Sequence, residues 1–91
     1  MNATKIKMKN GCAHSDKLTE ISEIFIEGCS SPGFYPKADV HDHVKKHPDS
    51  IYVNLPPYPS LIPATSLYGE KYVRSEPNDT PNDNLLKLPR Y

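Results

Sequence analysis

Polar side chains that could bind a small anion gather near the C-terminal end of the chain. Arg74 carries a planar fork of donors that can grip a carboxylate or a phosphate with two hydrogen bonds. Asn84 can both donate and accept, as the recognition of a base edge or an amide requires. With their neighbours they form the predicted ligand-binding set, which comprises Tyr72, Arg74, Asn78, Asp79, Asp83 and Asn84.

The same residues would also build a fixed loop. Arg74 would pair with Asp79 or Asp83 and hold the loop on a sheet. Asp83 would cap a one-turn helix through Leu86, and Asn78 would form an Asx-turn. Because every one of these residues suits loop construction, the structural role is favoured. A pocket for a small anionic or nucleotide-like ligand is the alternative, since such loops often carry binding residues.

Three histidines fall within one predicted helix and raise the question of a metal site. His43 and His47 are four residues apart, a spacing that can chelate one transition metal. His41 points elsewhere, the glutamate of a zinc-protease signature is missing, and Lys45 and Lys46 add positive charge beside any dication. We therefore predict a solvated face whose charge depends on pH, without a metal or other cofactor.

Groups that could act as nucleophiles or general acids do not form an ordered catalytic set. Cys12 with His14, and Cys29 further on, lack the spacing of a known thiol site, and no oxyanion donor can be named. Carboxylates that could act as acids or bases lie in the second predicted strand, at Glu20, Glu23 and Glu27. Carboxylates beside a strand are more often part of the solvated surface. We predict that the protein is not an enzyme and that both thiols stay reduced.

Tyrosines are the remaining candidates for recognition. The relevant side chains are Tyr52, Tyr58, Tyr68 and Tyr72. Exposed tyrosines beside a proline-rich segment could form a contact surface, because they offer area with few rotatable bonds. They could equally fill a thin core in a chain that has no tryptophan. The sequence favours neither interpretation.

Composition excludes several classes of protein. The 91 residues carry 11 basic and 11 acidic side chains, so the formal net charge is zero and we do not expect a nucleic-acid partner. The alternating lysines at 5–9 are the one feature that would support single-strand binding. No apolar stretch approaches the roughly 20 residues that span a bilayer, and no signal-peptide core is visible. We expect a cytoplasmic protein without membrane contact.

Hydrophobic periodicity predicts the elements that would position these groups. Alternating or β-branched stretches predict strands at 4–9, 17–27, 51–55, 61–67 and 70–75. Residues 17–27 also fit the apolar stripe of a helix, but their β-branched residues favour a strand. Pro36 suits a helix start, Val40 and Val44 form its apolar stripe, and Pro48 ends it, which predicts a helix at 36–47. A rigid extended connector is expected at 56–59, and a turn at Tyr68 and Gly69.

The predicted order is β-β-α-β-β-β, an α+β fold with one helix packed on a small, mostly antiparallel sheet. We expect a single domain over residues 1–91. Its C-terminal loop, residues 76–91, would be an ordered cap anchored by Leu85, Leu86 and Leu88.

The end of the chain follows the pattern Tyr-x-Arg-Thr/Ser-x-x-Asn-x-Thr-x-x-Asp-Asn-Leu-Leu-x-Leu-Pro. The residues that meet it are Tyr72, Arg74, Ser75, Asn78, Thr80, Asp83, Asn84, Leu85, Leu86, Leu88 and Pro89. In this the chain resembles an uncharacterised family of small bacterial and phage proteins, known as a domain of unknown function. The resemblance implies a compact α+β fold and a setting in the cytoplasm or in a phage-infected host cell. It implies no activity.

We therefore expect a small, non-catalytic binding or interaction module. An unknown protein or a small anionic ligand would be its partner, and a small sheet that covers its edge with a second copy would make a homo-oligomer. The first alternative is a phage or prophage protein that binds a nucleotide-like signal or inhibits a host defence factor. A small hydrolase or a single-stranded nucleic-acid binder ranks behind both.

Overall fold

A four-stranded sheet is built around the first strand of the chain. The computed structural model describes residues 1–77 and 83–91. Its sheet has the order β3-β2-β1-β4, in which the strands are β1 (Asn2–Met8), β2 (Ile21–Glu27), β3 (Gly33–Pro36) and β4 (Tyr52–Val53). The two pairings that involve β2 are antiparallel, and β1 pairs with β4 in parallel. The sheet is therefore mixed.

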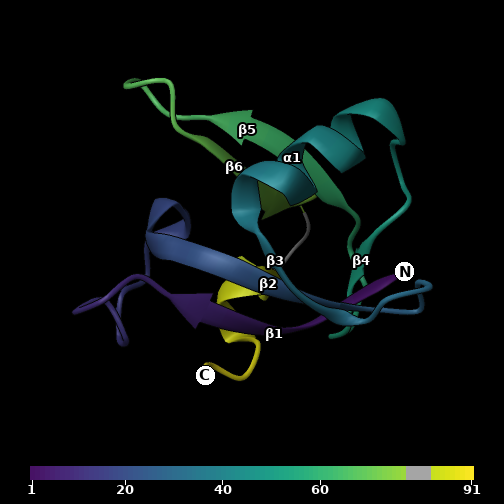
Figure 1. Cartoon of the computed structure of the whole chain (residues 1–91), viewed down its shortest axis with the longest axis horizontal. Coiled ribbons are helices and arrows are strands. Elements are labelled where there is room, and N and C mark those ends of the chain that lie inside the picture. The colour runs from purple at the N-terminus through teal and green to yellow at the C-terminus, as the bar shows by residue number, and fades with distance from the viewer. Residues whose placement is uncertain (78–82) are drawn as a thin grey trace.

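One helix and a hairpin lie on the same side of this sheet (Figure 1). The helix is α1 (Lys37–Lys46), and the hairpin pairs β5 (Leu61–Thr65) with β6 (Lys71–Ser75) in antiparallel register. Helix α1 contacts both hairpin strands and also β2 and β3. Two short 3₁₀ helices complete the fold, η1 (Leu18–Glu20) before β2 and η2 (Asn84–Lys87) near the C-terminus.

The core lies between the sheet, α1, the hairpin and η2. Val40 and Val44, the pair that the helical periodicity predicts to face inward, are both buried. Most of the other buried side chains come from the strands, where successive residues point to opposite faces of a sheet and one face carries the apolar residues. The buried apolar residues are Ala3, Ile6, Ile21, Ile24, Ile26, Val40, Val44, Ile51, Val53, Leu61, Val73, Leu85 and Leu88. No tyrosine belongs to this group, so the interpretation of the tyrosines as core filling is wrong.

The opposite face of the sheet carries lysines and aromatic rings. Lys5 Nζ lies 4.7 Å from the centre of the Phe25 ring, and Lys7 Nζ lies 4.7 Å from the centre of the Phe34 ring. The two rings meet edge to face at 5.1 Å. The basic outer face that the alternation in β1 predicts is therefore present, and its ammonium groups rest on aromatic rings.

The last residues of the chain dock along the edge of β1. Ile6 N donates to Pro89 O at 2.9 Å, and Tyr91 N donates to Ile6 O at 3.0 Å. Leu85 and Leu88 are buried beneath this segment. Residues 83–91 are thus docked on the sheet, whereas residues 78–82 of the predicted cap lie outside the described residues. The α+β class is confirmed.

Several elements differ from the sequence-based prediction, among them β4 and β5, which are shorter than the strands predicted at 51–55 and 61–67. Residues 33–36 form a strand, because Phe34 and Tyr35 pair with β2, and α1 begins only at Lys37. The second predicted strand begins at Ile21, after the 3₁₀ turn. The expected extended connector is a turn, in which Tyr58 N donates to Leu55 O at 2.7 Å.

Candidate functional site

The carboxylate of Asp83 holds the junction between β6 and η2. It accepts a hydrogen bond from Ser75 Oγ at 2.6 Å and further bonds from Ser75 N at 3.1 and 3.2 Å. Leu85 N also donates to it, at 3.0 Å, which makes Asp83 the N-cap of η2. The capping role predicted for Asp83 is confirmed.

The amide of Asn84 faces the interior. The residue is 1% exposed, and its Nδ2 donates to Pro56 O at 3.1 Å and to Leu55 O at 3.4 Å. It therefore ties the C-terminal cap to the proline-rich turn, a segment that the sequence places 28 residues earlier. Within the described contacts, Asn84 acts as scaffold beneath the predicted site.

Arg74 projects from the opposite side of β6. Val73 and Ser75 are buried, so the period of two places Arg74 outward on the same face as Tyr72. Its guanidinium forms no ion pair or hydrogen bond with the described residues. The pairing with Asp83 that the sequence suggested is therefore wrong, because backbone and hydroxyl donors occupy that carboxylate. The alternative partner, Asp79, lies outside the described residues, as does Asn78.

Arg74 lines a surface hollow of about 600 Å³. The lining residues described are Asp16, Leu18, Arg74, Asp83, Leu86, Lys87 and Arg90. Arg90 is held in place, since its guanidinium donates to the carbonyl oxygens of Ala13, Ser15 and Leu86 at 2.8–3.0 Å. Arg74 and Lys87 are exposed, and neither forms an ion pair with a described residue. Among the residues that the structure describes, the hollow thus presents two cations without an ion pair, Arg74 and Lys87, beside the carboxylate of Asp16, which also has none.

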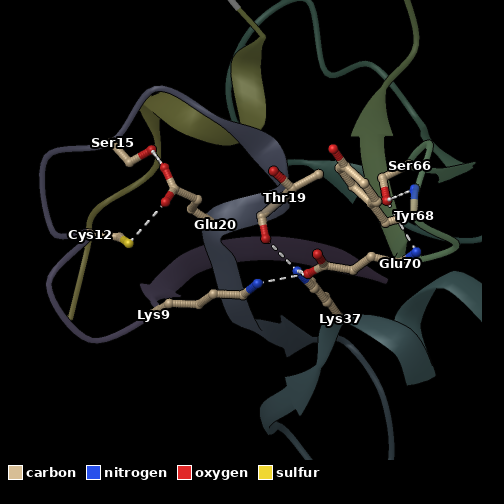
Figure 2. Close-up of polar contacts among 9 residues, drawn as sticks. All are labelled: Lys9, Cys12, Ser15, Thr19, Glu20, Lys37, Ser66, Tyr68 and Glu70. Atoms are coloured by element: carbon tan, nitrogen blue, oxygen red, sulfur yellow. Dashed lines mark hydrogen bonds and ion pairs between the residues drawn. The ribbon is translucent and has the colours of Figure 1, made fainter.

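A second polar cluster joins the sheet, the helix and the hairpin (Figure 2). Glu70 Oε2 accepts from Lys9 Nζ at 2.8 Å and also from Lys37 Nζ, which in addition donates to Thr19 O. Hydrogen bonds from Lys37 and then Lys9 lower the pKa of Glu70 to about 2. Burial lowers the pKa of Lys37 more than its bond to Glu70 raises it. Sequence reasoning missed this cluster, because its members are far apart in the chain and follow no motif.

The thiol of Cys12 belongs to a small network in the loop after β1. Cys12 Sγ donates to Glu20 Oε2 at 3.0 Å, and Ser15 Oγ donates to the other carboxylate oxygen (Figure 2). The bond to Glu20 raises the pKa of Cys12, whereas the bonds from Ser15 and Cys12 lower the pKa of Glu20. A protonated thiol and a stabilised carboxylate are the opposite of an activated nucleophile and its base.

The histidines of α1 do not share one environment. His41 is buried, with Nδ1 donating to Tyr72 O at 2.9 Å, so the prediction that it lies on a solvated face is wrong. It follows Lys37 by one helical turn, and both side chains face inward. The rings of His43 and His47 lie 5.1 Å apart. Among the described residues, no group of three histidine, cysteine or carboxylate side chains surrounds a point where a metal ion could bind.

Exposed apolar side chains mark the tip of the hairpin. Leu67 is 101% exposed and Tyr68 is 98% exposed, and the turn between them and β6 is fixed by Ser66 Oγ, which accepts from Tyr68 N and Glu70 N (Figure 2). Tyr52 and Tyr58 are also exposed. Three of the four candidate tyrosines are thus available at the surface.

Comparison with known proteins gives one result. The family described as "Protein of unknown function (DUF3892)" matches residues 2–89. The chain belongs to the DUF3892 family. Neither a curated protein nor a solved structure shows significant similarity to it. DUF3892 membership covers nearly the whole chain and confirms the resemblance seen in its C-terminal pattern, and it assigns no activity to the hollow or to the lysine–glutamate cluster.

Among the parts of this DUF3892 chain that the structure describes, no helix is long and apolar enough to cross a membrane.

Proposed function

We propose that the protein is a small, non-catalytic binding module that holds a small anion in the hollow beside β6. The observation that carries the proposal is Arg74, whose guanidinium is exposed over the hollow without a partner among the described residues. A guanidinium presented in this way can bind a carboxylate or phosphate through two parallel hydrogen bonds. Lys87 adds a second cation, and the carboxylate of Asp83 is already engaged by donors of the protein.

Side chains that could act as a nucleophile or a general base are bonded to other side chains of the protein, which supports a role without catalysis. Cys12 is held as a thiol by Glu20, and Glu70 is held as a carboxylate between two lysines. A general base works best when its pKa lies near the working pH, and the pKa of Glu70, about 2, is far below that range. We propose that Cys12 and Glu70 serve to stabilise loops.

A nucleotide-like molecule is the narrower candidate for the anion. Its phosphate would lie against Arg74 and Lys87, and the half-buried Leu86 would offer an apolar neighbour to its base. The family resemblance to bacterial and phage proteins supports a cytoplasmic setting, the host cytoplasm if a phage encodes the protein. There the module would sequester a signal molecule or inhibit a host defence factor. The exposed hairpin tip supports a second copy as a further partner.

Thermal-shift titration tests the anion site with three probes, which are inorganic phosphate, adenosine monophosphate and uncharged adenosine. We expect the two anions to raise Tm with concentration, as binding to the folded state requires, and adenosine to leave it unchanged. Arg74→Ala should weaken anion binding about 10- to 100-fold, the range of one charged hydrogen-bonding group. Arg74→Lys should restore part of it.

Lys45→Ala is the matched control, because Lys45 is an exposed cation on α1 outside the hollow. It should bind the anions like the unmodified protein. The proposal is refuted if neither anion shifts Tm, or if Lys45→Ala weakens binding as much as Arg74→Ala. A large fall in the Tm of unliganded Arg74→Ala would instead assign Arg74 to the scaffold.

A further inference from the structure

A second, smaller cavity lies against α1. Its volume is about 250 Å³, and its walls are mainly apolar side chains, among them Ile26, Val40 and Ile51. Four side chains on its walls have polar atoms, namely Cys29, Tyr35, Asp39 and His43. An engineered apolar cavity of roughly 150 Å³ admits benzene, and drug-sized ligands occupy roughly 300–1,000 Å³. The volume therefore suits a molecule with one ring and a short side chain.

The hydrogen-bond donors on the described walls each have a partner within the protein. The ammonium group of Met1, which also lines the cavity, donates to Ser50 O at 3.1 Å. Tyr35 donates its hydroxyl proton to Ser31 O. Cys29 Sγ donates to Ile26 O at 3.9 Å, a long bond of the kind that sulfur makes. Neither of these two side chains has a second proton to offer, so neither can donate to a ligand that only accepts hydrogen bonds.

Two groups on the described walls can accept a hydrogen bond from a ligand. The carboxylate of Asp39 forms no hydrogen bond or ion pair with a described residue, and a carboxylate can only accept. His43 follows it by one helical turn, on the same side of α1. Nε2 of His43 is buried and has no hydrogen-bond partner among the described residues. In the tautomer that carries its proton on Nδ1, this nitrogen can accept a hydrogen bond from a ligand.

We propose that this cavity binds a small aromatic amine, with the ring between α1 and the sheet and the ammonium group at Asp39. An apolar body matches the walls, and a cationic donor matches Asp39, the one charged side chain on the described walls. An ammonium group has three N–H donors, enough to serve both Asp39 and His43, which lie on the same side of α1. This site selects the opposite charge from the hollow beside β6, and it stands independently of the function proposed there.

The test uses 2-phenylethylamine, 2-phenylethanol and phenylacetate, which share ring and chain and differ in the end group. Binding to the full chain is followed by amide chemical-shift changes in NMR titrations. We expect the amine to bind most tightly, the alcohol less tightly, and phenylacetate at least tenfold more weakly than the amine. The shifts should centre on residues of α1 and on Ile26.

Two aspartates of α1 supply a matched pair of variants. Asp39→Asn should weaken binding of the amine about tenfold, the effect of one charged hydrogen bond, and leave the alcohol unchanged. Asp42→Asn removes the same charge from the same helix, at a side chain that pairs with Lys71 outside the cavity. It should leave all three affinities unchanged. Absence of amine binding, equal affinities for the three probes, or equal effects of the two variants would each overturn the proposal.

Discussion

At the scale of single residues, the charged side chains that the structure describes are of two kinds. Some form ion pairs or hydrogen bonds within the protein, and others face solvent without such a partner among the described residues. Glu70 is the clearest engaged group, because two lysines from different elements bond to one of its oxygens. Lys37 is the more buried partner, with 10% of its side chain exposed. Removing the carboxylate leaves a buried ammonium group without its counter-charge, which is costlier than the loss of an exposed pair.

Glu70→Gln should therefore destabilise the protein at neutral pH and change its response to acid. The pKa of Glu70 is lowered from 4.5 to about 2 in the folded state, so its stabilising effect is complete above pH 4.5 and disappears as the pH falls toward 2. We expect a loss of about 1–2 kcal/mol at pH 7, discounted because Glu70 is partly exposed. Between pH 4.5 and 2 the variant should lose stability less steeply than the unmodified protein.

Urea unfolding at a series of pH values measures both effects. Glu27→Gln is the control, because Glu27 is exposed and has no ion pair among the described contacts. If Glu70→Gln and Glu27→Gln gave parallel stability curves over that pH range, the lysine–glutamate cluster would have no energetic role.

At the scale of elements, the β5–β6 hairpin has two different ends. Its base is buried through Leu61 and Val73, whereas its tip exposes Leu67 and Tyr68 almost completely. An apolar tip on a turn fixed by Ser66 is a suitable anchor for a second molecule, because little freedom is lost when it binds. We therefore propose this tip, in place of a sheet edge, as the contact through which a homo-oligomer would form.

Replacing both tip residues, Leu67→Ser with Tyr68→Ser, should raise the dissociation constant of self-association at least tenfold. Tyrosine at an interface centre typically contributes more than 1 kcal/mol, and leucine less. Sedimentation equilibrium over a range of concentrations measures the constant. Tyr58→Ser serves as the control, since Tyr58 is exposed on a different segment. A protein that stays monomeric at every concentration, or that associates equally well in both variants, would exclude this contact.

At the scale of the whole molecule, the two ends of the chain meet in one core. The radius of gyration is 11.9 Å, close to the roughly 12 Å expected for a folded domain of this length. Leu85 contributes to the same apolar cluster as Ile6 and Val44, and the backbone of Ile6 bonds to residues 89 and 91. We therefore expect the C-terminal cap to unfold together with the sheet.

Leu85→Ala should lower the free energy of unfolding by about 2–5 kcal/mol, the usual result of emptying a buried leucine site. That is a large part of the roughly 5–15 kcal/mol that stabilises a small domain. Leu67→Ala makes the same chemical change at a fully exposed leucine and should alter stability by less than about 0.5 kcal/mol. Denaturant unfolding compares them, and equal, small effects would show that the cap is not docked.

The local features of this fold could be predicted because they depend on residues close in sequence. Asp83 caps a turn two residues ahead of it, and the helix that ends before Pro48 follows from spacing alone. The helix start was placed one residue early, because Pro36 suits a strand end as well as a helix start.

The predicted site could be recovered only in part, for a related reason. Composition marked Arg74, Asp83 and Asn84 as polar residues of one loop, but it could not say which would be engaged by the fold. Asn84 turned inward because distant carbonyl groups, those of Leu55 and Pro56, needed a donor. Arg74 stayed outward because its strand places Val73 and Ser75 in the core.

The amino-acid order by itself determined the class of fold, the helix, most strand positions and the family, since these follow from periodicity, capping and a contiguous C-terminal pattern. Tertiary structure alone decided the strand at Gly33–Pro36, the meeting of Lys9, Lys37 and Glu70, and the cavity against α1. The strand at Gly33–Pro36 depends on its pairing with the neighbouring β2. The lysine–glutamate cluster and the cavity join segments separated by long stretches of chain, and such contacts form only where burial and hydrogen bonding together outweigh the entropy lost in closing the loop between them.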